Sequence, residues 1–275
     1  MTTEHHSPQY RIVASDLDGT LLNPNHQLST KTKQTLKTLH DQGFTFVFAT
    51  GRHHVDVSGI REIAGIPAFM ITSNGARVHN ENNQLLLSKN VPEELVQSIV
   101  DILKDDPTIY VHIYRNDEWY LSHDDEEIAA YHNESGFNFI PFDANQAPTD
   151  GVAKVFFTSI HKDHEHLAKY EEQINKKFGD KLSVAFSSPW CLEVMGAGVS
   201  KGEALKIIAE SLNLSLENCI AFGDGMNDVE MLTMAGKGLV MGTAHPKVHQ
   251  ALPQIERIGS SADDAVAKYL EDNLL

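Results

Sequence analysis

The sequence has few cysteines and no long apolar runs. Its only cysteines, Cys191 and Cys219, each lie in an apolar, strand-like segment, so buried free thiols are expected and a disulfide framework is not. No apolar run approaches the roughly 18 residues that a membrane span requires. The polar first ten residues contain no stretch like a signal peptide. Together these absences predict a cytoplasmic protein that does not bind a membrane.

Positive charge is also scarce. The chain has 22 basic and 38 acidic residues, which gives a formal net charge of −16. Such a charge opposes nucleic-acid binding, and it would also repel an anionic substrate unless a site supplies positive charge locally. The 15 histidines are spread out without zinc-like spacing. Nothing in the sequence points to an obligate protein partner.

What the chain does have is a pair of carboxylates at the end of a strand. Asp16 and Asp18 follow the short apolar run 12–14 in the segment Asp16-Leu17-Asp18-Gly19-Thr20-Leu21-Leu22. In an open α/β sheet, ligands bind where strands end. One carboxylate can act as a nucleophile while the other moves protons. The alternative for this segment alone is a turn with a helix cap, because Asp and Gly are common in turns.

Three more segments follow the same rule. Thr50, Gly51 and Arg52 come after the apolar run 44–48. Ser200 is a plausible N-cap that places Lys201 at a helix start, where anions are favoured. The loop 223–228, Gly-Asp-Gly-Met-Asn-Asp, follows a strand-like run and offers oxygens suited to a hard divalent cation. Each piece alone could be an ordinary loop, but their joint order favours a catalytic site.

Strands and helices alternate on both sides of a long central region. This pattern predicts a doubly wound parallel sheet with helices on both faces. The expected strands are 11–15, 44–49, 68–72, 218–222 and 238–241, and the expected helices are 30–42, 54–63, 201–212, 227–235 and 262–271.

The central region reads instead as an inserted α+β module. We expect helices at 92–104, 124–133 and 163–178, and strands at 108–115, 118–121, 152–159 and 182–187. The predicted division is a core of residues 1–83 and 189–275 with an insertion of residues 84–188. The polar stretch 80–83 and the turn 187–189 are the expected hinges.

With these motifs in order, the chain resembles the haloacid-dehalogenase-like hydrolases, and among them the Cof-type phosphatases. Stretches 48–57 and 70–78 resemble most closely those members that hydrolyse pyridoxal phosphate and sugar phosphates, and 191–195 and the Asp224 loop add to this. The resemblance implies a Rossmann-like core with a cap domain of the larger, C2 type, which would close over the site and select the leaving group.

The resemblance also implies the chemistry. Asp16 would attack phosphorus and form an aspartyl-phosphate, which divides one difficult hydrolysis into two easier transfers. Asp18 would protonate the leaving alcohol and then accept a proton from the attacking water. The substrates would be small phosphorylated metabolites.

A Mg²⁺ ion would be the cofactor. Its ligands would be the Asp16 carboxylate, the Asp18 carbonyl, Asp224 and waters, while Asp228 would orient those waters or Lys201. The phosphoryl oxygens would be bound by the amides of Leu17 and Gly51 and by Thr50, Lys201 and Asn227.

Specificity has weaker signals. Arg52, Asn74 and Glu193 are candidates for contact with the leaving group. For each of them, a structural salt bridge or loop cap is an equally strong expectation. A solvated role is expected for His53 and His54. Trp119, Tyr120 and Trp190 could stack on a substrate ring, although packing in the core or at a hinge is the stronger expectation.

Two other function classes remain open. A phosphosugar mutase could use the same core. Product analysis would separate the two activities, because a phosphatase releases free phosphate and a mutase moves the phosphate to another position of the sugar. A phosphorylation-dependent receiver is less consistent with Asp18 and Lys201, because a lasting acyl phosphate is not compatible with a nearby general base.

Overall fold

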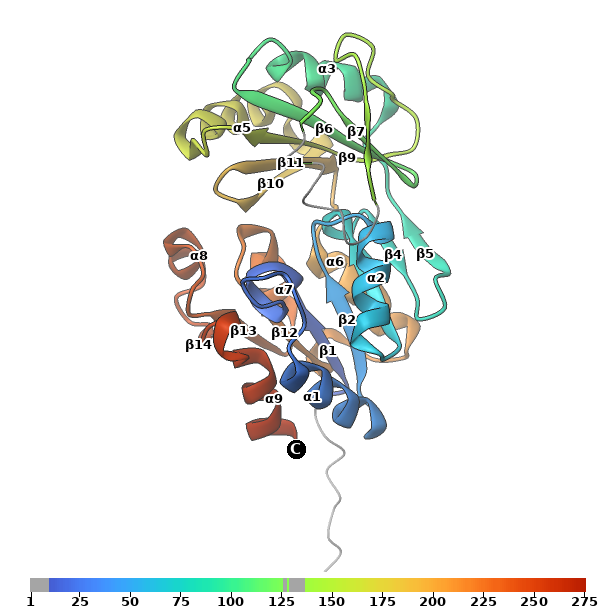
Figure 1. The fold of residues 1–275 in the computed structure, drawn as a ribbon, viewed down its shortest axis with the longest axis vertical. Helices are drawn as coiled ribbons and strands as arrows, with labels where there is room; N and C mark the ends of the chain where they lie inside the picture. Colours follow the sequence, from blue (N-terminus) through green and yellow to red (C-terminus); the bar gives the residue numbers. More distant parts are fainter. Residues whose placement is uncertain (1–9, 126–127, 129–136) are drawn as a thin grey trace, which may run out of the picture.

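The computed structural model describes residues 10–125, 128 and 137–275. These residues form an eight-stranded sheet and a six-stranded sheet, one above the other in Figure 1. The helix predicted at 124–133 lies almost entirely outside them and stays a prediction. None of the described helices is both long and apolar enough to cross a membrane.

The larger sheet is mostly parallel, in the order β14-β13-β12-β1-β2-β3-β4-β5. Strand β1 lies between β12 and β2 and is parallel to both, whereas β4 and β5 are antiparallel additions at one edge. The strands are β1 (Ile12–Ser15), β2 (Thr45–Ala49), β3 (Ala68–Thr72), β4 (Arg77–His79), β5 (Leu85–Ser88), β12 (Cys219–Gly223), β13 (Lys237–Met241) and β14 (Glu256–Ile258).

Helices cover both faces of this sheet, which confirms the doubly wound prediction. Side chains of α1, α2 and α9 pack in one apolar cluster with alternate residues of the strands. Side chains of α6, α7 and α8 pack on the opposite face. The helices are α1 (Thr30–Asp41), α2 (His54–Ala64), α6 (Lys201–Ser211), α7 (Val229–Met234), α8 (Pro246–Ala251) and α9 (Ala265–Leu274).

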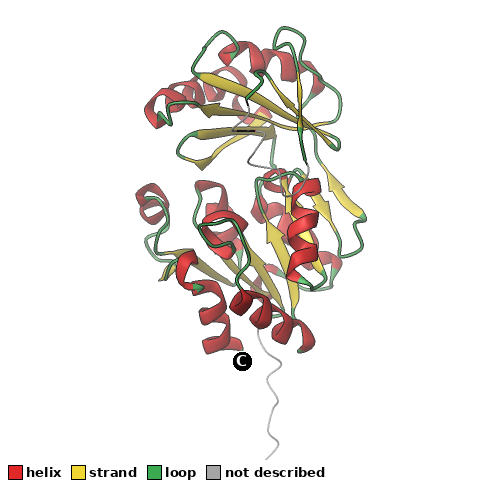
Figure 2. Ribbon diagram, viewed as in Figure 1, coloured by secondary structure: helices red, strands yellow, loops and turns green. Residues whose placement is uncertain are grey.

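The smaller sheet belongs to the insertion. Its order is β10-β11-β9-β6-β7-β8, and α3 and α5 pack on one of its faces through a separate apolar cluster. Its other face is turned toward the larger sheet (Figure 2). The elements are α3 (Glu93–Leu103), β6 (Ile109–Arg115), β7 (Glu118–Leu121), β8 (Phe139–Pro141), β9 (Val152–Ser159), α5 (His164–Phe178), β10 (Leu182–Ser188) and β11 (Cys191–Gly196).

The chain changes sheets at other places than the sequence predicts. Strand β5 lies in the larger sheet and β11 in the smaller one, so the changes fall near residues 89–91 and after Gly196 rather than at 83/84 and 188/189. The expected hinge at 80–83 is the β4–β5 hairpin turn, in which the Asn80 amide donates to the Gln84 carbonyl. The turn 187–189 joins β10 to β11 within one sheet. We call residues 91–196 the inserted module.

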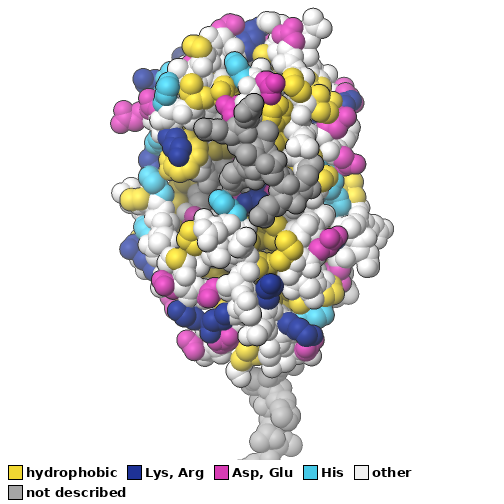
Figure 3. Space-filling view, in the orientation of Figure 1, with side chains coloured by type: hydrophobic (Ala, Val, Ile, Leu, Met, Phe, Trp, Pro, Cys, Tyr) yellow, Lys and Arg dark blue, Asp and Glu magenta, His cyan; other side chains and the backbone are white. Residues whose placement is uncertain are grey.

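The strands and helices that the sequence missed are mostly very short. Strands β4, β8 and β14 have three residues each, β5 has four and α8 has six, too few to show a period. Strand β11, with six residues, was also not among the expected strands. On the face shown in Figure 3, acidic and basic side chains of the described residues are interspersed. The negative net charge is therefore not gathered into one patch on that face.

Candidate active site

Carboxylates from separate motifs meet at one edge of the larger sheet. Asp16 follows β1, and Asp224 follows the neighbouring parallel strand β12. Neighbouring parallel strands bring their carboxyl ends to the same edge. Carboxylate oxygens of Asp16, Asp224 and Asp228 all lie within 4.8 Å of one another. We call these three residues, with Asp18 and Lys201, the carboxylate edge.

Lys201 joins two members of this edge. It is the first residue of α6, and the N-cap Ser200 accepts a hydrogen bond from the Glu203 amide at 3.1 Å. Its Nζ donates to Asp16 Oδ1 at 2.7 Å and to Asp228 Oδ1 at 2.6 Å. Since the lysine is fully buried, its ammonium is fixed between the two carboxylates. The predicted capped helix start is confirmed.

The carboxylate edge holds more negative than positive charge. Burial raises the pKa of Asp16 well above its usual range against the opposing charge of Lys201, and Asp228 and Asp224 raise it further. Burial and Asp228 also raise the pKa of Asp224 to about 7, although the Thr20 hydroxyl donates to its carboxylate at 2.8 Å. Lys201 pairs with two of the three carboxylates of Asp16, Asp224 and Asp228. When all three are ionised, their surplus of two negative charges fits a divalent cation with oxygen ligands.

Backbone geometry brings the two acidic loops together. Asp228 Oδ2 accepts hydrogen bonds from the amides of Asp224, at 3.0 Å, and Gly225, at 2.8 Å. Gly19 has φ +78°, and a Cβ added there would lie 2.4 Å from Asp224 Oδ2. Glycine at this position therefore permits both the left-handed turn and the close approach of the loops.

Asp18 is engaged by a side chain that the sequence grouped with specificity. Arg52 donates from Nε to Asp18 Oδ2 at 2.7 Å and from Nη2 to Oδ1 at 2.6 Å, and from Nη1 to Asp56 at 2.9 Å. Burial would raise the pKa of Asp18, but hydrogen bonds from His26 and Arg52 hold it well below its usual range. Asp18 is therefore held as a carboxylate in this arrangement.

The candidate phosphate ligands lie around the same edge, but not all of them reach the cavity described below. Thr50, Gly51 and Asn227 line it, as does Asp228. The Thr50 hydroxyl accepts from the Arg52 amide at 3.1 Å. The side chain of Leu17 is fully buried in the core; the roles expected for its amide and for that of Gly51 stay predictions.

Asn74 and Glu193 do come together, beside a lysine that sequence reasoning missed. Lys154 on β9 forms a buried ion pair with Glu193 on β11 and also donates to the Gly51 carbonyl at 2.7 Å. Asn74 Nδ2 donates to the other oxygen of Glu193, and Asn74 Oδ1 accepts from Asn227 Nδ2 at 3.0 Å. This network links the inserted module to the loops of the larger sheet. The signal was a lysine inside an otherwise apolar strand.

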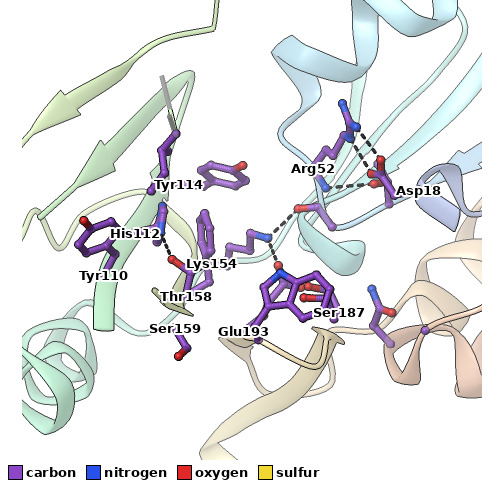
Figure 4. A pocket seen from close by; sticks show the side chains of 18 of the residues that line it. Asp18, Arg52, Tyr110, His112, Tyr114, Lys154, Thr158, Ser159, Ser187 and Glu193 are labelled. Carbon is purple, nitrogen blue, oxygen red and sulfur yellow. Dashed lines mark hydrogen bonds and ion pairs between the residues drawn. The ribbon is translucent and has the colours of Figure 1, made fainter. Parts of the chain in front are cut away.

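A cavity of about 650 Å³ extends from the carboxylate edge to the inserted module. Figure 4 shows Asp18 and Arg52 on one side of it, Tyr110 and His112 on the other, and Lys154 in between. The far side is lined by Tyr110, His112, Tyr114, Trp119 and Phe156, which we call the aromatic wall.

The expectation of solvated histidines at 53 and 54 is wrong. His53 is 1% exposed and stacks on Phe137 at 4.5 Å, and burial lowers its pKa to about 3. Its Nε2 bonds to the carbonyl of Asn116 at 2.8 Å. His54 is partly buried and lies 3.1 Å from an oxygen of Asp117. Both rings are covered because the β6–β7 turn of the inserted module packs against the start of α2.

The three aromatic candidates have different positions. Trp119 is 2% exposed and packed, yet it lines the cavity. The hydroxyl of Tyr120 donates to Glu118 at 2.7 Å, and its ring packs beside the module's own core. Trp190 is 41% exposed at the cavity, with Lys162 Nζ 5.2 Å from its ring centroid. Packing thus describes two of the three.

Comparison with known proteins shows the family to which the chain belongs. The haloacid dehalogenase-like hydrolase family matches residues 13–270. A Haemophilus influenzae protein, provisionally named a phosphatase, is 44% identical over 95% of this chain and 96% of its own. A Yersinia pestis protein named HMP-PP phosphatase is 38% identical over 95% and 94%. The solved structure of a haloacid dehalogenase-like hydrolase from B. subtilis is 26% identical, with a TM-score of 0.81 over 96% of this chain and all of that one.

Proposed function

Because the chain belongs to the haloacid dehalogenase-like hydrolases, we propose that it is a Mg²⁺-dependent phosphatase of small metabolites. The favoured substrates are pyridoxal phosphate and sugar phosphates. The observation that carries the proposal is the Asp16 carboxylate, fixed by Lys201 at the end of β1 among surplus acidic groups and open to a cavity much larger than a phosphate group.

In this proposal Asp16 is the nucleophile. Its oxygen attacks phosphorus, the bond to the leaving oxygen breaks, and water later hydrolyses the acyl phosphate. Lys201 holds the attacking carboxylate in position, because its ammonium contacts Asp16 Oδ1 at 2.7 Å. The same positive charge reduces repulsion between the carboxylate and the incoming phosphoryl group.

Asp18 moves the proton. It must separate from Arg52 before it can carry a proton to the leaving oxygen, and a phosphate oxygen is an alternative partner for the guanidinium. Arg52 thus has two competing anionic partners in the cavity. Thr50, Gly51 and Asn227 also line the cavity and are the proposed contacts for the remaining phosphoryl oxygens.

Asp16 and Asp224, with the carbonyl of Asp18, would hold the Mg²⁺ ion, which would supply charge neutralisation for the two anions that react. Asp228 already bonds Lys201 and two loop amides, so its proposed task is to keep Asp224 and Lys201 in place.

The test is release of inorganic phosphate from a panel that includes pyridoxal phosphate, glucose 6-phosphate, HMP-PP and p-nitrophenyl phosphate. HMP-PP is included because of the name of the Yersinia relative. We expect release from several esters in the presence of Mg²⁺. No release from any ester would contradict the proposal.

A phosphosugar mutase on the same core is the second candidate. The two activities differ in product, since a mutase returns an isomeric sugar phosphate and no free phosphate. Incubation of glucose 6-phosphate and glucose 1-phosphate, followed by phosphorus NMR, would distinguish them. We expect free phosphate.

A further inference from the structure

The aromatic wall results from strand register in the smaller sheet. Strands β6 and β9 pair antiparallel, with Tyr110 opposite Thr158 and His112 opposite Phe156. Side chains alternate between the two faces of a sheet, so these four share one face, and all four line the cavity. The alternating residues Ile109, Val111, Ile113, Val155 and Phe157 pack in the module's core with α3 and α5.

A hydrogen-bonded series runs across this wall. Trp119 Nε1 donates to His112 Nδ1 at 3.2 Å, and His112 Nε2 lies 2.8 Å from the hydroxyl oxygen of Thr158. An indole N–H can only donate, so Nδ1 of His112 is the acceptor and carries no proton. The ring's proton is therefore on Nε2, and Thr158 Oγ1 accepts it.

This order fixes what Thr158 can do. A hydroxyl that accepts from histidine still has its own proton to donate. The residues that the structure describes supply no acceptor for it, and Thr158 lines the cavity. The series therefore offers a hydrogen-bond donor to whatever occupies the space next to the aromatic wall (Figure 4).

The rings of the wall beside this donor stack on one another. The ring of His112 stacks on that of Phe156 at 4.3 Å and 16°, and it lies nearly parallel to Trp119 at 5.9 Å and 10°. A planar ring can lie along such a surface by offset or edge-to-face contact. A hexose would bring several hydroxyls to a wall in which Trp119 and His112 already bond each other and the Tyr110 hydroxyl already donates to Asp125 at 2.9 Å, and unpaired buried hydroxyls are costly.

We propose that Thr158, oriented by Trp119 and His112, is a specificity-determining residue that donates a hydrogen bond to an in-plane acceptor of a heteroaromatic leaving group. This inference rests on the proposed phosphatase function of the same cavity. If it holds, the preferred substrates are phosphate esters in which the phosphate is carried on a methylene group of an aromatic ring, and that ring has a nitrogen atom or an oxygen substituent. Sugar phosphates are then poorer substrates.

The test compares Thr158→Val, which removes the hydroxyl at nearly constant shape, with Thr158→Ser, which keeps it. The substrates are pyridoxal phosphate and benzyl phosphate. Like pyridoxal phosphate, benzyl phosphate has an aromatic ring, a methylene and a phosphate, but its ring has no hydrogen-bond acceptor. We expect Thr158→Val to lower kcat/KM for pyridoxal phosphate about tenfold, mainly through KM, which is the size of one hydrogen bond. Benzyl phosphate should change less than about twofold.

Two further variants serve as checks. Trp119→Phe removes the donor that fixes the tautomer of His112, and it should produce a smaller loss that is again selective for pyridoxal phosphate. Ser183→Ala removes a hydroxyl on β10 that does not line the cavity, and substrate ranking should be unchanged. Thr158→Ser should restore most of the wild-type preference.

An equal loss for both esters in Thr158→Val, or no loss for either, would overturn the role of the hydroxyl. A wild-type preference for glucose 6-phosphate over pyridoxal phosphate would overturn the heteroaromatic class while leaving a phosphatase. If no ester is hydrolysed, the proposed function fails. The role of Thr158 is then tested on its own by measuring ligand binding. Pyridoxine 5′-phosphate, which has no aldehyde to react with lysine, should bind Asp16→Asn about tenfold more tightly than Asp16→Asn/Thr158→Val; equal binding would refute it.

Discussion

The carboxylate edge and the aromatic wall face each other across one cavity, but they are built differently. The edge consists of charged groups at strand ends and a helix start, each within a few residues of a chain turn. The wall consists of rings that project from the middle of strands β6, β7 and β9. In the proposed function, the edge would bind any phosphate ester, whereas the wall of fixed rings would distinguish what the phosphate is attached to.

The two regions are joined at buried contacts. Lys154 of the module bonds the Gly51 carbonyl, and His53 of the larger sheet's loops bonds the Asn116 carbonyl in the module. In the proposed function, catalysis and substrate discrimination would therefore depend on contacts that belong to neither region alone.

Asp16→Asn should have the largest effect. The amide is nearly isosteric but is a poor nucleophile and a poor metal ligand, so activity should fall roughly 10³-fold or more. Phosphate release measures this, with circular dichroism to show that the fold is kept. Asp41→Asn, at an exposed acid that pairs with Lys37, is the control, and its activity should stay within about twofold of the wild type. More than a few per cent activity in Asp16→Asn would exclude the nucleophile assignment.

Removal of divalent metal should abolish turnover while leaving the aromatic wall intact. We expect activity to vanish in a chelator, to return with Mg²⁺ and not to return with Ca²⁺, whose larger and looser shell would misplace the carboxylates. Phosphate release in metal-free buffer with each ion added back is the measurement. Full activity with Ca²⁺ would assign the ion a purely structural task.

Lys154→Met should break the buried contacts that Lys154 makes between the inserted module and the loops of the larger sheet. It leaves Glu193 buried without its cation, and loss of one member of a buried pair costs about 3–5 kcal/mol. Urea unfolding measures the change in the free energy of unfolding. Lys162→Met, which removes an exposed lysine at the same cavity, should cost less than about 1 kcal/mol. The double variant Lys154→Met/Glu193→Gln should recover part of the loss, and equal costs for the two lysines would contradict the buried pair.

The buried contact of His53 with the inserted module should make the stability of the protein depend on pH. Burial lowers the pKa of His53 to about 3 in the folded chain, against 6.5 as the ordinary value, so the unfolded chain binds more protons between these two values. The contribution of His53 to the free energy of unfolding is therefore fully present above pH 6.5. It is lost as the pH is lowered, and the loss is on the order of 2–3 kcal/mol near pH 4. Urea midpoints at pH 7, 5.5 and 4.5 measure it. His53→Gln cannot titrate, so it should show a shallower decline; an unchanged decline would assign the effect to other groups.

Much of the architecture followed from the sequence. The predicted strands 68–72, 118–121 and 152–159 match β3, β7 and β9 residue for residue, because apolar runs bounded by turns specify strands locally. The carboxylate edge followed as well, since parallel topology brings the ends of β1 and β12 together whatever the packing details. The domain boundaries did not follow, because the strands next to both boundaries, β5 and β11, were not among the expected strands. Strand β5 joins the larger sheet through its hairpin with β4, and β11 joins the smaller sheet by pairing with β9 and β10.

The sequence by itself therefore determined the fold class and which acidic residues gather at the sheet edge. Only the tertiary structure decided that Lys154 pairs with Glu193, that His53 is covered, and that Trp119 fixes the proton on His112. The physical reason is the range of the interactions. Motif chemistry is written in consecutive residues, whereas burial, hydrogen-bond direction and the register of β6 against β9 arise only when segments far apart in the chain meet.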